Sequence, residues 1–136
     1  MKRLILASIL IASAILAACA TASLPLAATS GADPGAAKHN AEGIAHYNLG
    51  HWDMAKTHFE AAIKADPKLA EAHYNLALSL DKLGAHTDAT DHFKKAAELA
   101  PGNTAITDSV TYRRHVRPSR DYDRGYGYGG YGGGMY

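Results

Sequence analysis

Apolar positions in the middle of the chain recur with the spacing of helices. In residues 53–65 and again in residues 87–99, small alanines and one phenylalanine fall on a single helical stripe. Each stretch follows a glycine turn and ends before a proline, and both residue types are ordinary helix stop signals. The pattern predicts four helices, at about residues 37–49, 53–65, 69–83 and 87–99.

The helical pattern also repeats along the chain. The word AHYNL occurs at Ala45–Leu49 and at Ala72–Leu76, but the offset between these two copies does not align the turn glycines, the phenylalanines or the closing prolines. A longer offset aligns HFEAAIKADP at His58–Pro67 with HFKKAAELAP at His92–Pro101, together with the turn glycines and core alanines. The repeating unit is therefore a pair of helices, and its period is the longer offset, from His58 to His92.

A helix-turn-helix unit of this length and pattern resembles the tetratricopeptide repeat. The second-helix signature of that family, alanine, phenylalanine and a closing proline, is complete in both copies. The first-helix positions of the family hold His39, Glu42, Gly43 and His46 in one copy and His73, Leu76, Ala77 and Leu80 in the other, so the family's Trp, one Leu and both Tyr positions are replaced. The resemblance covers residues 36–101 and implies an all-α fold with repeats at 37–67 and 70–101.

Two repeats are few, because neighbouring units in such arrays bury each other's faces. Residues 104–116 are expected to form a capping helix with Ile106 and Val110 facing the core. The alternative is stacking against a second copy of the chain, so weak self-association stays open.

The first eighteen residues have the layout of a secretory signal peptide, with Lys2 and Arg3 before an uncharged apolar run. Residues 16–19, Leu-Ala-Ala-Cys, resemble the bacterial lipobox, which implies cleavage before a lipid-modified Cys19. The alternatives are ordinary signal cleavage near residues 18–22 and an uncleaved anchor. Lipidation would make residues 19–36 a flexible tether, and Ala20 after the cysteine implies the outer membrane, facing the periplasm.

Composition narrows the function classes. A formal net charge of +1 does not indicate any class of binding partner. The sequence contains no nucleophile elbow and no phosphate-binding loop, so we expect a protein that is not an enzyme and needs no cofactor. Residues 117–136, rich in Arg, Gly and Tyr, are predicted to be a disordered tail. Export makes nucleic acid an unsuitable partner for this tail.

The resemblance implies a concave groove, formed by the first helix of each repeat, that binds a peptide or helix of another protein. The two copies of AHYNL are out of register by nearly two helical turns, so Tyr47 and Tyr74 are expected on the same face. The basic residues of the subgroup that binds chaperone tails are missing, which excludes that ligand. The residues assigned to the groove are Asn40, Ile44, Tyr47, Asn48, Tyr74, Asn75, Leu78 and Asp81.

The eight histidines suggest a second hypothesis, a His-rich envelope protein that binds or handles metal. His39 and His46 are roughly 10 Å apart along a helix, too far to share one ion. With His73 they occupy positions of interhelix packing, so packing is the preferred interpretation. His58 and His92, equivalent sites one repeat apart, are the remaining candidate ligands. The favoured function is a lipoprotein of the envelope that binds an unidentified partner protein.

Overall fold

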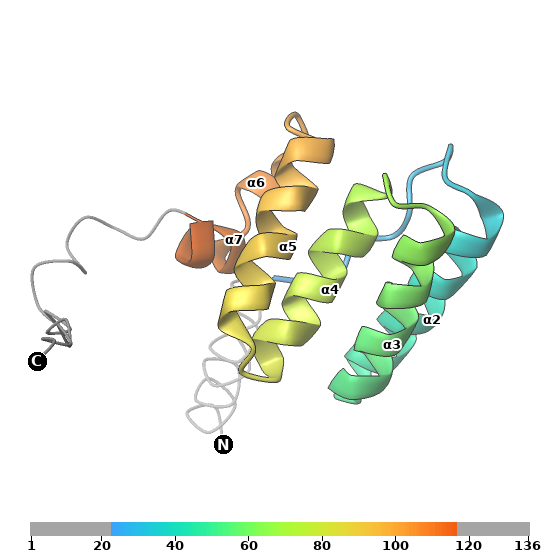
Figure 1. Cartoon of the computed structure of the whole chain (residues 1–136), viewed down its shortest axis with the longest axis horizontal. Coiled ribbons are helices and arrows are strands. Elements are labelled where there is room, and N and C mark those ends of the chain that lie inside the picture. Colours follow the sequence, from blue (N-terminus) through green and yellow to red (C-terminus); the bar gives the residue numbers. More distant parts are fainter. Residues whose placement is uncertain (1–22, 117–136) are drawn as a thin grey trace, which may run out of the picture.

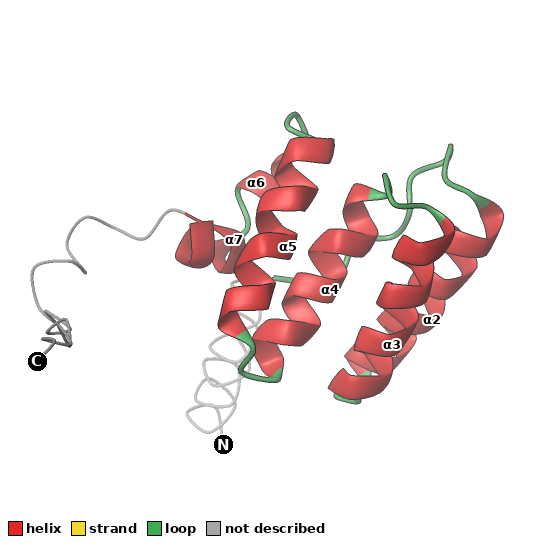
Figure 2. Ribbon diagram, in the orientation of Figure 1, coloured by secondary structure: helices red, strands yellow, loops and turns green. Residues whose placement is uncertain are grey.

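The computed structural model describes residues 23–116, in which all regular structure is helical (Figures 1 and 2). The all-α prediction is confirmed for this part of the chain. The predicted signal peptide, Cys19 and the tail at 117–136 lie outside the described residues. The helices are α2 (Pro34–Asn48), α3 (Trp52–Ala65), α4 (Ala70–Lys82), α5 (His86–Leu99), α6 (Thr104–Thr107) and α7 (Val110–Val116).

Local chemistry fixes where the repeat helices begin and end. The Asp33 carboxylate caps α2 by accepting hydrogen bonds from two backbone N–H groups, and Pro34 occupies the first turn. Gly50 and Gly84 follow α2 and α4 with φ of 77° and 81°, the left-handed conformation that glycine adopts without steric cost. At each glycine two backbone hydrogen bonds close the helix, so the equivalent turns of the two repeats have the same geometry.

The helices pack as two hairpins, α2 with α3 and α4 with α5, and α3 lies against α4 (Figure 1). Phe59 and Phe93 are fully buried between the helices of their own repeats. Gly43 allows the close approach in the first repeat, because a Cβ there would lie 2.5 Å from the Phe59 ring. Every residue from Ala70 to Leu80 is buried, so α4 forms the centre of the domain.

The predicted capping helix is corrected in its details. Residues 104–116 form two short helices, because α6 ends at Thr107 with Asp108 as its C-cap, and the Ser109 hydroxyl accepts a hydrogen bond from Tyr112 N–H to start α7. Ile106 and Tyr112 are buried, whereas Val110 is 42% exposed. The break therefore changes which face of α7 meets the core, and Tyr112 takes the role expected of Val110.

The predicted tether is also corrected. The first helix begins at Pro34 rather than at residue 37, so residues 34–36 belong to α2. Before it, Leu26 packs on the main core, and Ala28 and Ala32 pack on a smaller cluster that contains Ala36 and Ala62. The described part of the predicted tether, residues 23–36, therefore belongs to the domain. Across residues 23–116, none of the helices combines the length and the apolar character needed to span a bilayer.

Candidate functional site

Of the residues assigned to the groove, four line one cavity and two form hydrogen bonds with each other and with Leu26: Tyr47, Asn48, Leu78 and Asp81 at the cavity, Asn40 and Asn75 at Leu26. Asn40 and Tyr47 from α2 are buried, as are Tyr74, Asn75 and Leu78 from α4. The three other assigned residues are more accessible: Ile44 and Asp81 are partly buried, and Asn48 is exposed. The structure adds what the sequence did not predict, an extended segment of the same chain lying against the groove.

Two asparagine side chains hold that segment by its backbone. The Asn75 Oδ1 accepts a hydrogen bond of 2.7 Å from Leu26 N–H, and the Asn75 amide donates one of 2.7 Å to the Leu26 carbonyl oxygen. The Asn40 amide donates to the same carbonyl oxygen at 3.0 Å, and the Asn75 amide also donates to Asn40 Oδ1 at 2.8 Å. Both asparagines are fully buried, so the groove here recognises a peptide group and not a side chain.

The segment is fixed at its other end by hydroxyl groups. The Ser23 Oγ accepts hydrogen bonds from Thr111 N–H at 3.2 Å and from the Thr111 hydroxyl at 2.9 Å. Burial raises the pKa of the Tyr74 hydroxyl, and its hydrogen bonds to Ser109 and Ser23 oppose that rise. Residues 23–26 therefore connect the first helices of both repeats to α7.

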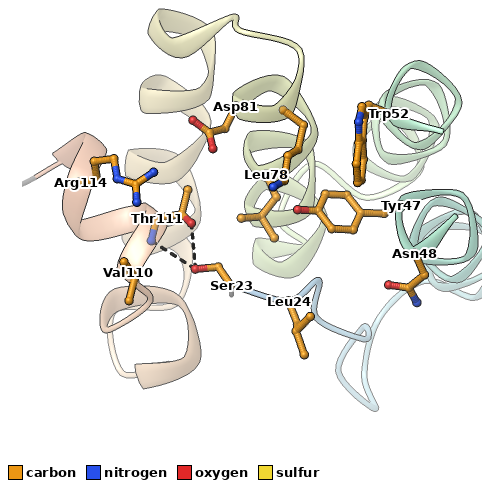
Figure 3. Close-up of a pocket in the computed structure, with 11 residues that line it drawn as sticks. Ser23, Leu24, Tyr47, Asn48, Trp52, Leu78, Asp81, Val110, Thr111 and Arg114 are labelled. Carbon is orange, nitrogen blue, oxygen red and sulfur yellow. Dashed lines mark hydrogen bonds between the residues drawn. The ribbon is translucent and has the colours of Figure 1, made fainter. Parts of the chain in front are cut away.

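Beside this segment the groove stays open as a cavity of about 380 Å³ (Figure 3). The ring of Tyr47 meets Trp52 edge to face, with centroids 4.8 Å apart, and Lys82 Nζ lies 5.7 Å from the centroid of the Trp52 ring. Burial, followed by the negative charge of Asp81, raises the pKa of Tyr47 to about 12, so its hydroxyl stays protonated. The lining residues are Ser23, Leu24, Tyr47, Asn48, Trp52, Leu78, Asp81, Lys82, Val110, Thr111 and Arg114.

Sequence reasoning missed the extended segment and Trp52. One signal for the segment was available, because Leu24 and Leu26 flank Pro25, and the residue before a proline favours extended backbone. Trp52 follows the Gly50 turn closely, and only the packing of α3 against α2 brings it beside Tyr47.

The two histidines considered as metal ligands lie in different places. His92 is paired with His73, with Nδ1 atoms 3.1 Å apart, and His73 Nε2 lies 3.2 Å from the Pro67 carbonyl oxygen. Burial lowers the pKa of both, which favours two neutral rings linked by a hydrogen bond. His58 instead lies beside Glu42 and His39. His39, His46 and His73 do lie between the helices of their repeats, where their rings stand near or stack on neighbouring histidines.

Paired helices that recur at a fixed period and stack around a groove define a helical-repeat protein. Residues 40–104 match the family model of the tetratricopeptide repeat, so this part of the chain is a tetratricopeptide-repeat region. Tetratricopeptide repeats generally bind protein partners and are generally not catalytic. A search of curated proteins found no match to this chain.

Proposed function

We propose that this chain is a lipid-anchored protein of the bacterial cell envelope that binds a partner protein through the groove of α2 and α4. The observation that carries the proposal is the extended segment at Ser23–Leu26, which already lies in that groove. The groove thus has the chemistry that peptide recognition needs: buried amides for the backbone, and an aromatic-lined cavity beside them.

The open cavity is the part of the groove available to a partner. Tyr47 and Trp52 form an apolar wall, and Lys82 and Asp81 bring opposite charges to its edge. An extended segment of the partner would insert an apolar side chain beside Trp52 and align its polar groups with the two charges. Leu24, which is 66% exposed at the cavity, would extend the apolar contact surface.

Lipidation at Cys19 would place this groove close to the membrane. Ser23 is fixed to α7, so the chain from Cys19 to Ser23 would be the whole link between the lipid and the folded domain. A link of that length spans at most about 14 Å when fully extended. The proposed anchor therefore holds the domain beside the outer membrane and raises its effective concentration near membrane partners.

Photo-crosslinking in cells tests the site. A photo-reactive amino acid replaces Asn48 at the cavity or, as the control, Glu60, which is exposed on α3. We expect a discrete crosslinked partner from position 48, identified by mass spectrometry, and none of that species from position 60.

A matched pair of substitutions separates binding from folding. Trp52→Ala removes the aromatic wall, whereas Met54→Ala removes a side chain that is 50% exposed on the same helix and does not line the cavity. Trp52→Ala should abolish the crosslink and Met54→Ala should keep it, with helix content checked by circular dichroism. Equal crosslinking by both variants would show that the cavity is not the binding site.

A further inference from the structure

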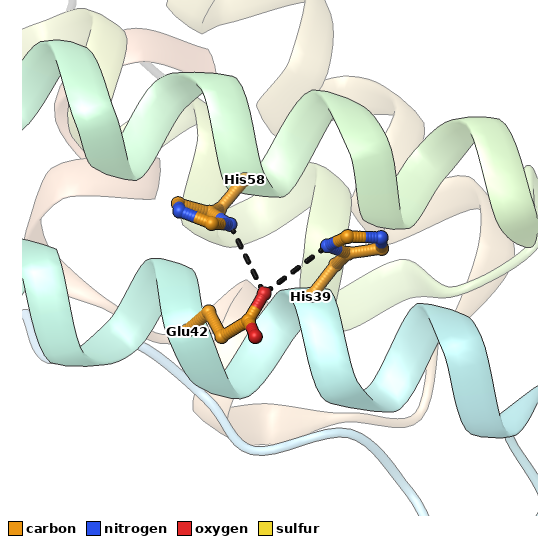
Figure 4. Close-up of side chains that lie close together, drawn as sticks. All are labelled: His39, Glu42 and His58. Carbon is orange, nitrogen blue, oxygen red and sulfur yellow. Dashed lines mark ion pairs between the residues drawn. The ribbon is translucent and has the colours of Figure 1, made fainter.

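The face of α2 that meets α3 carries a second cluster of polar side chains, separate from the groove. His39 and Glu42 lie one helical turn apart and share this face, and His58 reaches them from α3 (Figure 4). The Nδ1 atoms of both histidines lie 3.2 Å from the same carboxylate oxygen, Glu42 Oε2. The three ligand atoms all lie within 4.8 Å of one another.

The distances of 3.2 Å from the two Nδ1 atoms to Glu42 Oε2 are close to those between the ligand atoms of one metal ion. A tetrahedral zinc ion with bonds of about 2.0–2.2 Å holds its ligand atoms roughly 3.3–3.6 Å apart. The cluster therefore needs only small side-chain rotations to bind an ion with two imidazole nitrogens and one carboxylate oxygen. Lys38 Nζ lies 4.0 Å from the other oxygen of Glu42, Oε1, which leaves Oε2 for the ion.

The surroundings of His39 and His58 support the same interpretation. The Nδ1 of His39 is enclosed and makes no hydrogen bond within the described residues. Although this atom lies 3.2 Å from Glu42 Oε2, the angles of the contact are not those of a hydrogen bond. The ring of His46 stacks on His58, with centroids 5.1 Å apart and planes 13° from parallel, and so restricts its orientation. A metal ion would give the enclosed nitrogen a partner.

The second repeat supplies a natural comparison. His73 and His92 are the equivalents of His39 and His58, one repeat further along the chain, but Leu76 stands where the first repeat has Glu42. Without a carboxylate, the two Nδ1 atoms face each other at 3.1 Å and form a hydrogen bond. The same helix hairpin thus has a three-ligand cluster in one repeat and a closed histidine pair in the other.

We propose that His39, Glu42 and His58 bind one divalent transition-metal ion, for which Zn²⁺ is the probe. Imidazole nitrogens select this class over Mg²⁺ and Ca²⁺, which prefer oxygen ligands. The side chains are between 28% and 41% exposed, so water or a group from another molecule completes the coordination. The site is independent of the groove and does not require partner binding.

Calorimetric titration of the metal-free mature chain with ZnCl₂ near pH 7.5 tests the proposal. We expect one ion per chain at the strongest site and no comparable binding of MgCl₂. Glu42→Gln and, separately, His58→Gln should each weaken zinc binding about tenfold or more, since loss of even a residue that supports a ligand costs about 10–100-fold.

Two control variants keep the test specific. His92→Gln alters the equivalent pair of the second repeat, and His86→Gln alters a second group of metal-type side chains among residues 23–116, Asp81, His86 and His115. Both controls should retain the wild-type zinc affinity, and circular dichroism should show intact helices for every variant. Absence of zinc binding by the wild-type chain, one ion per two chains, or equal binding by Glu42→Gln and wild type would each overturn the proposal.

Discussion

The side chain of Asn75 is the centre of the contact between the N-terminal segment and the repeats. It makes three hydrogen bonds, two with the backbone of Leu26 and one with Asn40, and it is fully buried. Asn75→Ala removes all three at once. Because the N–H of Leu26 and the Oδ1 of Asn40 then lose their partners, the substitution also leaves enclosed polar groups unsatisfied.

The expected cost follows from these bonds. A hydrogen bond within a protein contributes about 1 kcal/mol net, and an unsatisfied buried group costs about 1–3 kcal/mol. Asn75→Ala should therefore lower the free energy of unfolding by about 2–4 kcal/mol, a large part of the stability of a small domain. Asn48→Ala is the matched control, because Asn48 is exposed, and it should change stability by less than about 0.5 kcal/mol.

Urea unfolding of a soluble form that begins at Ala20 measures these energies, and amide hydrogen exchange at Leu26 reports the segment directly. Exchange at Leu26 should be protected in wild type and fast in Asn75→Ala. The variant Asn75→Asp keeps the acceptor for Leu26 N–H but loses both donors, so it should be destabilised at neutral pH and partly recover on acidification. Unchanged stability and unchanged exchange in Asn75→Ala would refute the role given to this asparagine.

Three further predictions concern packing, pH and the anchor. Gly43→Ala places a Cβ 2.5 Å from the buried Phe59 ring. The destabilisation caused by overpacking, about 1–3 kcal/mol, should exceed the gain in helix propensity of about 1 kcal/mol, so the melting temperature should fall. The folded-state pKa values of His73 and His92 are lowered below 6.5, so the unfolded chain binds more protons. The stability that these neutral rings contribute is fully present above about pH 6.5 and is lost as pH falls through their folded-state pKa values. Urea unfolding from about pH 7 to pH 5 should show this loss. If the free energy of unfolding of His73→Gln fell equally steeply with pH, the prediction would be contradicted. Radiolabelled palmitate should label the wild-type chain in cells and not Cys19→Ala, and labelling that persists would disprove the anchor.

The repeat architecture was predictable because its signals are local. The glycines at 50 and 84 and the phenylalanines at 59 and 93 report turns and packing without knowledge of the rest of the chain. The expectation that Tyr47 and Tyr74 share one face stays a prediction, although both side chains are buried. Local signals of this kind predicted the fold and four of the residues that line the cavity, Tyr47, Asn48, Leu78 and Asp81.

What could not be predicted depends on contacts between distant residues. Leu26 and Asn75 are 49 positions apart, and no periodicity connects an extended segment to a helix in another repeat. The cluster at His39, Glu42 and His58 was not predicted, because His58 lies on a different helix from the other two and only the packing of α3 against α2 brings it to them. Glu42 lies at a position where the family pattern expects a different residue, and this departure creates the cluster.

The N-terminal segment also explains how a domain of two repeats covers its own surface. The central helix α4 meets α3 on one side and α5 on the other, so its groove face would be exposed without residues 23–26 and α7. The hydrogen bonds between Ser23 and Thr111, 88 residues apart, join the two covering elements. A partner that displaced the segment would expose this apolar face and break the asparagine contacts, at a cost of several kcal/mol. A partner that entered the cavity beside Trp52 would keep those contacts, which is why the proposed binding site is the open part of the groove.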